Sequence, residues 1–143
     1  MSAPGGEWLL MVDGAARGNP GNAGCGAAIF DESGKLLDEL CRYLGHATNN
    51  VAEYEGLLMG LERVLRLGGK RLRVQSDSQL LVRQLNGLYR VKDEKLKRLH
   101  QRALGLLRQL EAYHIIHVGR EHNRLADRLA NRAIDDARRP LFD

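Results

Sequence analysis

The sequence has the length of one ordinary globular domain, with 143 residues of which 43% are apolar and 28% are charged. Its 22 basic and 18 acidic residues nearly balance and aromatic residues are scarce, which excludes an acidic disordered tail and an aromatic stacking platform. The longest apolar run, Trp8 to Val12, is too short to span a membrane, and the first residues lack the pattern of a secretion signal.

The first third of the chain shows strand patterns. Residues 7–13 form a continuous apolar run ending in Asp13, which is typical of a central strand covered on both faces. The glycine-rich residues 14–24 are expected to form a loop. Residues 25–30 and 35–44 flank an Asp-Glu-Ser-Gly turn and predict a β-hairpin.

The two cysteines lie on the two predicted hairpin strands. Cys25 and Cys41 fall within one residue of direct register, so a disulfide is sterically conceivable. Two cysteines are nevertheless too few for a disulfide scaffold, and their spacing is not that of metal ligands. We therefore expect two free thiols buried as apolar side chains, and a reducing cytoplasm as the compartment.

The rest of the chain alternates helical and strand patterns. Apolar residues at helical spacing predict a helix over 51–67, capped by Asn50 and ended by Gly68 and Gly69. Further elements are expected as a strand over 72–76, helices over 78–85 and 93–110, a strand over 113–118, and a helix over 124–138 capped by Asn123. This order predicts one α/β domain over residues 1–143, with a mixed sheet covered by helices.

Four carboxylates fall at the ends of predicted elements, namely Asp13, Glu53, Asp77 and Asp127. Each alone also fits a structural role in a turn, a capping box or a helix cap. Glu53 and Asp127, however, share helical faces with apolar residues, where a carboxylate needs a partner. If all four converge, at least one would protonate unless divalent cations neutralise the group, and oxygen ligands favour Mg²⁺ or Mn²⁺ over Zn²⁺.

Five motifs follow one another in order over about residues 8 to 137. They are Asp13-Gly-(x)₃-Gly18-Asn19-Pro20-Gly21, Gly24-x-Gly26-Ala27, Thr48-Asn49-Asn50-x-x-Glu53, Ser76-Asp77-Ser78-Gln79 and Asn123-x-x-Ala126-Asp127-x-Leu129-Ala130. Together these motifs resemble type 1 ribonuclease H. The resemblance implies a five-stranded mixed sheet of order 3-2-1-4-5 with helices on both faces. It also implies a metal-dependent endoribonuclease that hydrolyses the RNA strand of RNA·DNA hybrids to products with 5′-phosphates.

The same resemblance assigns roles to individual residues. Two Mg²⁺ ions about 4 Å apart would be bridged by Asp13, with Glu53 and Asp77 at one site and Asp127 at the other. Small polar side chains would face the minor groove of the hybrid and bind ribose hydroxyls without reading sequence. These side chains are Asn19, Thr48, Asn49, Asn50 and Gln79.

Two features depart from the family pattern. His122 is the candidate for the family's assisting histidine, but it stands in a short loop only five residues before Asp127, and a solvent-exposed loop histidine is the alternative. The basic protrusion with tryptophans that many members carry is missing, and His46 stands where an arginine often holds a DNA phosphate.

A basic stretch offers a substitute for the missing protrusion. Residues 90–108 contain seven basic and two acidic residues. Lys95, Arg98 and Arg102 share one helical face and could follow a phosphate track, or the stretch could be a solvated helix face. Two further functions stay open: a module of the same fold that binds nucleic acid without cutting it, and the same hydrolysis on double-stranded RNA. We expect a monomer.

Overall fold

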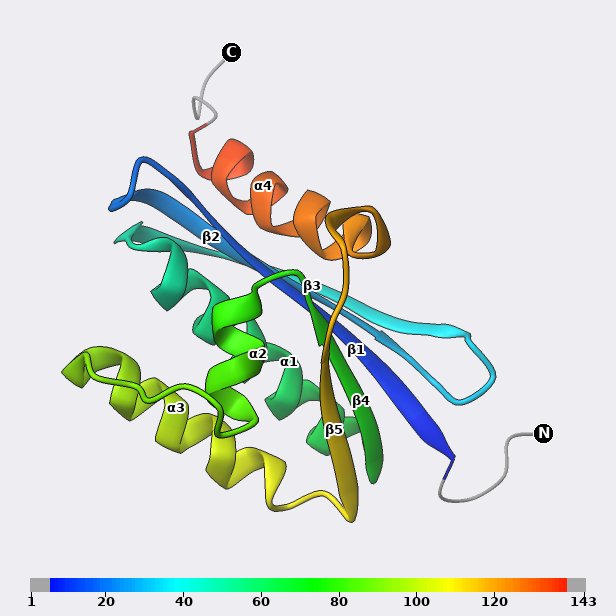
Figure 1. Ribbon diagram of the computed structural model, residues 1–143. Helices are drawn as coiled ribbons and strands as arrows, with labels where there is room; N and C mark the ends of the chain where they lie inside the picture. Colours follow the sequence, from blue (N-terminus) through cyan, green and yellow to red (C-terminus); the bar gives the residue numbers. More distant parts are fainter. Residues whose placement is uncertain (1–5, 139–143) are drawn as a thin grey trace.

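The computed structural model describes residues 6–138, in which a five-stranded sheet carries helices on both of its faces (Figure 1). The strand order is β3-β2-β1-β4-β5, as the resemblance implies. β1 pairs antiparallel with β2 and parallel with β4, so the sheet is mixed. The strands are β1 (Glu7–Arg17), β2 (Gly21–Phe30), β3 (Leu36–Ala47), β4 (Arg71–Ser76) and β5 (Ala112–His117).

The helices divide between the two faces. α1, α2 and α3 form a layer on one face, and α4 lies alone on the other (Figure 1). The core lies between the sheet and the larger layer, and Leu10, Leu57 and Leu61 are fully buried there. No helix within residues 6–138 is long and apolar enough to cross a membrane. The helices are α1 (Asn49–Leu67), α2 (Gln79–Leu85), α3 (Glu94–Leu107) and α4 (Arg124–Arg138), with a single 3-10 turn at Arg120–His122.

The expected glycine-rich loop over 14–24 is wrong. β1 continues to Arg17 and β2 starts at Gly21, which leaves a tight turn between the two strands. The glycines stay in extended strands because helices pack directly on them: a Cβ at Gly24 would lie 2.7 Å from the carbonyl oxygen of Ala130 in α4. The small residues therefore serve close packing rather than chain reversal.

The expected cap of the first helix is also wrong. α1 begins at Asn49, and the Thr48 hydroxyl accepts a hydrogen bond of 3.2 Å from the Val51 amide, as an N-cap does. Asn50 lies inside the first turn, so its side chain is free to face outward. Because Thr48 caps the helix, no capping box uses Glu53.

The two cysteines are free, as expected, but only Cys25 is buried. Cys25 pairs with Arg42 across the hairpin, and Cys41 pairs with Gly26. Neighbouring register positions alternate between the two faces of a sheet, so the two thiols point to opposite faces. The expectation that Cys41 is buried is therefore wrong, because its strand lies at the sheet edge with its side chain exposed.

Candidate active site

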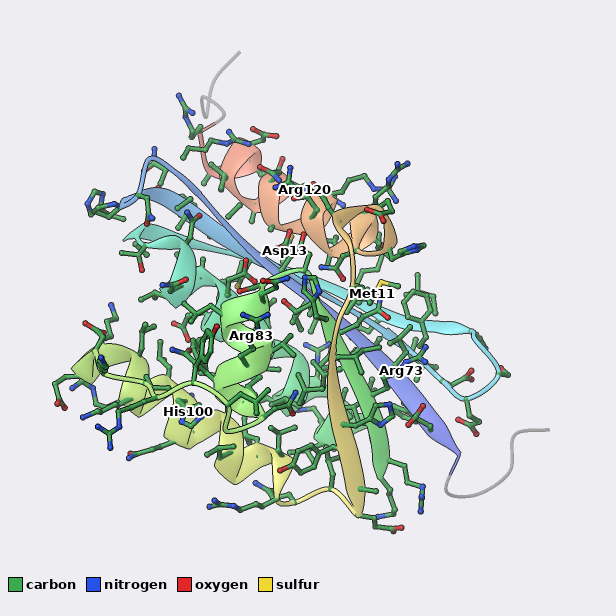
Figure 2. The ribbon with its side chains drawn as sticks, in the orientation of Figure 1. Met11, Asp13, Arg73, Arg83, His100 and Arg120 are labelled. Atoms are coloured by element: carbon green, nitrogen blue, oxygen red, sulfur yellow. The ribbon has the colours of Figure 1, made fainter. Side chains whose placement is uncertain are left out.

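Three of the four carboxylates meet at one edge of the sheet. Asp13 lies in β1, Asp77 directly follows β4, and Glu53 lies in α1. Because β1 and β4 run parallel, with Met11 opposite Gln75, Asp13 and Asp77 each stand two residues beyond this pair and lie next to each other. One carboxylate oxygen from each of the three acids lies within 4.8 Å of the others, and Figure 2 shows Asp13 at the centre of the molecule.

A glycine next to Asp13 brings Glu53 into this group. A Cβ at Gly14 would lie 2.3 Å from the carbonyl carbon of Ala52 and 2.3 Å from the amide nitrogen of Glu53, closer than real Cβ atoms come to other atoms. Only a residue without a side chain lets the backbone of α1 contact β1 here. Because α1 contacts β1 at Gly14, it places Glu53 next to Asp13.

Asp127 reaches the site from the opposite face of the sheet. α4 packs on β2 through Gly26, whose Cβ would lie 2.6 Å from the carbonyl oxygen of Ala126. Asp127 borders the same hollow as the other three acids and interacts with Asp13, although it lies outside the group of three oxygens. The four acids thus come from two separate helical layers and from the sheet between them.

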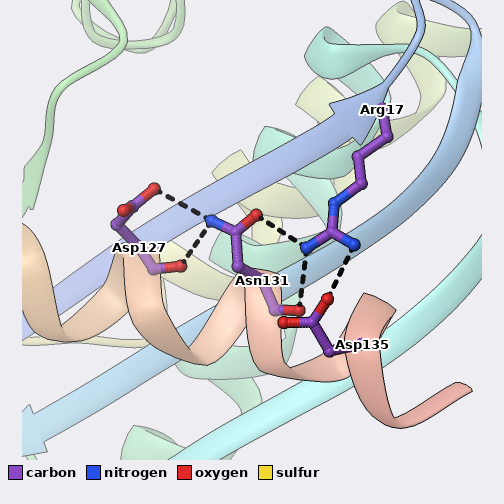
Figure 3. Close-up of polar contacts among 4 residues, drawn as sticks. All are labelled: Arg17, Asp127, Asn131 and Asp135. Atoms are coloured by element: carbon purple, nitrogen blue, oxygen red, sulfur yellow. Dashed lines mark hydrogen bonds and ion pairs between the residues drawn. The ribbon is translucent and has the colours of Figure 1, made fainter. Parts of the chain in front are cut away.

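A chain of polar contacts holds Asp127 in place (Figure 3). Asn131 Nδ2 donates to the carbonyl oxygen of Asp127 at 3.0 Å and to its carboxylate at 3.3 Å. An Arg17 guanidinium nitrogen donates to Asn131 Oδ1 at 3.3 Å, and its other terminal nitrogen pairs with Asp135 at 2.7 Å. The arginine therefore fixes which end of the amide faces Asp127.

Crowding changes the ionisation of the buried acids. Burial, with added repulsion from Asp77 and a contact with Asp127, raises the pKa of Asp13 to about 8. Burial also raises the pKa of Glu53 well above its ordinary range, and the charges of Asp13 and Asp77 add to the effect. Without a cation, burial and mutual repulsion therefore favour the protonated forms of Asp13 and Glu53.

The donor set fits a hard divalent cation. Glu53 Oε2 is buried and has no hydrogen-bond partner among residues 6–138, which is costly unless a positive group faces it. The three converging groups offer only carboxylate oxygens, the ligands that Mg²⁺, Mn²⁺ and Ca²⁺ prefer. The acidic cluster could therefore hold a divalent metal ion.

The acids line an open hollow of about 590 Å³, which we call the acidic hollow. Its walls are built from the sheet edge, the start of α1, the start of α2 and the segment that joins β5 to α4. The predicted residues on these walls are Asp13, Asn49, Asn50, Glu53, Asp77 and Asp127.

A second hollow of about 540 Å³ adjoins the acidic hollow and shares Asn50 with it. We call it the α3 hollow, because Lys95 of α3 lines it together with Asn19, His46 and Thr48. Asn19 Oδ1 accepts a hydrogen bond of 3.1 Å from the Asn49 amide, which ties the β1–β2 turn to the start of α1. The predicted polar residues therefore form one continuous surface from the acids to α3.

The other predicted residues lie outside both hollows. Gln79 is exposed at the start of α2, and Arg98 is exposed on α3. Arg102 pairs with Glu62 at 3.4 Å across exposed surface. His122 is exposed, lies 3.8 Å from the Glu121 carboxylate and does not line the acidic hollow.

Two further side chains on the wall of the acidic hollow are not among the predicted site residues. His117 and Arg120 both line the hollow. His117 is the last residue of β5 and pairs with Ser76, directly before Asp77. Since parallel strands end at a common edge, its position one step from the acids was a usable signal.

Comparison with known proteins gives one consistent family. Residues 11–133 match the family model described as reverse transcriptase-like. The chain is 41% identical over 133 residues to the Ribonuclease HI of Halobacterium salinarum, covering 93% of this chain and 67% of that protein. It is 42% identical over 130 residues to the bifunctional protein Rv2228c of Mycobacterium tuberculosis, but spans only 36% of the length of that relative.

Solved structures agree with the sequence comparison. The N-terminal RNase H domain of the Mycobacterium tuberculosis protein superposes with a TM-score of 0.89 at 41% identity, covering 92% of this chain and 95% of that one. LC11-RNase H1, solved in complex with an RNA/DNA hybrid, superposes with a TM-score of 0.86 at 41% identity, covering 91% and 98%. TM-scores this high over nine-tenths of the chain show that these proteins share its fold.

Proposed function

Because the chain belongs to the type 1 ribonuclease H family, we propose that it is an endoribonuclease that hydrolyses the RNA strand of RNA·DNA hybrids and leaves 5′-phosphates. The observation that carries the proposal is the convergence of Asp13, Glu53 and Asp77 within 4.8 Å at the end of parallel strands. A relative with 41% identity was solved with an RNA/DNA hybrid bound, which supports the substrate class.

The proposed cofactor is Mg²⁺, with Mn²⁺ as a substitute, held by Asp13, Glu53, Asp77 and Asp127. When bound, such ions activate a water molecule and stabilise the charge on the leaving oxygen of the phosphodiester. Among residues 6–138, Ser78 is the one serine or cysteine that lines the acidic hollow, and its hydroxyl caps α2 by accepting from the Leu81 amide. The proposed role of the carboxylates is therefore to hold the cations, and no side chain of the acidic hollow attacks the phosphate itself.

The remaining residues of the two hollows would position the hybrid. Asn19, Thr48, Asn49 and Asn50, with Gln79 beside them, offer hydroxyl and amide groups that suit ribose 2′-hydroxyls and base edges of a shallow minor groove. Asn49 is already oriented, because its Oδ1 accepts a hydrogen bond of 3.0 Å from the Ala16 amide. The proposed assistance of His122 would come from outside the acidic hollow, while His117 faces the hollow directly.

Cleavage assays on three substrates test the proposal. An RNA·DNA hybrid, a double-stranded RNA and a DNA duplex with one embedded ribonucleotide, each labelled on the strand of interest, are incubated with the protein and Mg²⁺. We expect short RNA products with 5′-phosphates from the hybrid and none after chelation. Asp77→Asn should remove the activity, whereas the matched change Glu39→Gln, at an exposed acid on β3, should not.

The pattern of products separates the alternatives. Uncut hybrid that still binds the protein would favour the binding module and contradict the proposal. Equal cutting of hybrid and double-stranded RNA would extend the substrate class to both. We further propose that residues 1–143 act as a single domain and a monomer in the cytoplasm, which light scattering and localisation of a tagged copy would check.

A further inference from the structure

A third hollow, of about 790 Å³, lies beside α4 and is lined by Arg120, Glu121, Arg124, Asp127 and Arg128. We propose that its three arginines bind backbone phosphates of the strand that is cut, next to the scissile position. This inference rests on the proposed function, because it takes the acidic hollow as the place of cleavage. We call this third hollow the arginine groove.

The three arginines of the arginine groove have no partners of their own. Within residues 6–138, none of the guanidinium groups of Arg120, Arg124 and Arg128 makes an ion pair or a hydrogen bond, and all three residues are exposed. The nearby arginines behave differently, because Arg17 pairs with Asp135 and Arg132 pairs with Asp136. Free guanidinium groups gathered around one hollow are suited to bidentate contacts with phosphate.

The geometry places these guanidinium groups on one track. Arg124 and Arg128 stand four residues apart, so they lie on the same side of α4, and Arg120 lies in the 3-10 turn just before it. The arginine groove shares Arg120 and Asp127 with the acidic hollow. Figure 2 shows Arg120 on the α4 side of Asp13. A phosphodiester strand that enters the acidic hollow at Asp127 therefore continues directly into the arginine groove.

The arginine groove places positive charge next to the acidic hollow. A phosphate that approaches the four acids meets like charge, so binding of the cut strand needs positive charge close by. The arginine groove has three positive side chains against two negative ones, at the border that Asp127 shares. The α3 hollow, which shares Asn50 with the acidic hollow, is lined by Lys95 together with the acid Asp93. The net positive charge beside the acidic hollow therefore comes from the arginine groove, which would compensate for the missing basic protrusion.

The test compares Arg124→Gln/Arg128→Gln with Arg132→Gln, a matched control on the same helix whose arginine already has a partner. Steady-state cleavage of a hybrid is measured between about 0.05 and 0.3 M salt, and hybrid binding is measured by fluorescence anisotropy in chelator. We expect the double variant to raise KM and Kd about tenfold near 0.15 M salt and to lower the log-log salt slope by up to about two, with kcat within about twofold. The control should match the wild type.

The strand assignment is tested with hybrids that carry one cleavable stretch of ribonucleotides. Shortening the cut strand on the side of the arginine groove should remove the KM difference between the wild type and the double variant, while shortening the DNA strand should preserve it. Failure at the two levels is distinguishable. If the wild type binds the hybrid but does not cut it, the proposed function fails, and the anisotropy slopes still decide whether the arginines bind phosphate.

Three results would overturn the inference. The first is an unchanged Kd and salt slope in the double variant. The second is an equal loss in Arg132→Gln, which would reflect the general charge of α4. The third is a KM difference that disappears only when the DNA strand is shortened, which would place the other strand in the groove.

Discussion

Asn131 uses one amide nitrogen to bind Asp127 twice, at its carbonyl oxygen and at its carboxylate one helical turn before. The amide oxygen of Asn131 accepts a hydrogen bond from the Arg17 guanidinium group. Asp127 therefore depends on a residue of β1 that is four positions from Asp13, so the strand that carries one acid also orients another. Asp127, which lies in α4 on the other face of the sheet, is thus held in position relative to β1.

Asn131→Ala should weaken cation binding at Asp127 without changing hybrid binding. We expect kcat to fall about tenfold, KM to stay within about twofold, and the cation concentration for half-maximal activity to rise. Calorimetric titration of the hybrid-free protein with Mg²⁺ gives a readout that does not depend on turnover. Arg17→Met should produce a smaller shift in the same direction, since Asn131 keeps its helix bond. A variant with normal cation binding and normal kcat would contradict the positioning role.

Asp13→Asn should stabilise the metal-free protein at high pH. The pKa of Asp13 is about 8 in the folded chain and 3.8 ordinarily, so between these values the folded state holds more protons than the unfolded state. The free energy of unfolding then decreases as the pH rises through this window, and the cost is absent below about pH 4. In chelator at pH 8 we expect Tm to rise by at least about 3 °C over the wild type. The difference should shrink towards pH 4, and an equal Tm at both pH values would contradict the crowding.

Asp13→Asn should also lower the rate of hybrid cleavage by several orders of magnitude. Hybrid binding in metal-free buffer should stay intact or become tighter, because one anion that faces the phosphate is removed. Retention of more than about a tenth of the wild-type activity would contradict a bridging role for Asp13.

The basic face of α3 should contribute affinity and no chemistry. Lys95→Gln/Arg98→Gln/Arg102→Gln is expected to raise KM strongly near 0.15 M salt, to flatten the log-log salt slope by up to about three, and to leave kcat nearly unchanged. Lys95 should dominate, because it lines the α3 hollow while Arg102 already pairs with Glu62. Salt dependence equal to that of the wild type would make the stretch a solvated helix face.

The positions of the four acids in the fold could be predicted because their signals are local. Asp13 and Asp77 each stand at the end of a predicted strand, although β1 itself continues to Arg17. Glu53 shares a helical stripe with Leu57, Leu61 and Val64, all of which are buried. The ladder between β1 and β4 then brings the two aspartates together. The strand order came from the family resemblance that the motifs carry, because local patterns alone do not determine it.

The glycine-rich segment and the arginine groove were missed because both depend on contacts between distant segments. Residues 14–24 look like a loop because glycine favours turns, and only the helices packed on them explain their extended conformation. The arginine groove was missed for the same reason, since Arg120, Arg124 and Arg128 interleave with Glu121 and Asp127 and give no run of one charge. Their separation from acidic partners appears only in three dimensions.

The contact at Gly14 also limits how this protein can vary. A side chain there would meet the main chain of Ala52 and Glu53, and no substitution elsewhere removes a backbone atom. Gly60 is different, because its Cβ would lie 2.6 Å from Leu10 Cδ1, a side-chain atom that Leu10→Ala would delete. A change at Gly60 thus has a possible second-site suppressor, whereas a change at Gly14 has none among its neighbours. Selections for suppressors should therefore recover second-site changes for a substitution at Gly60, and only true revertants for a substitution at Gly14.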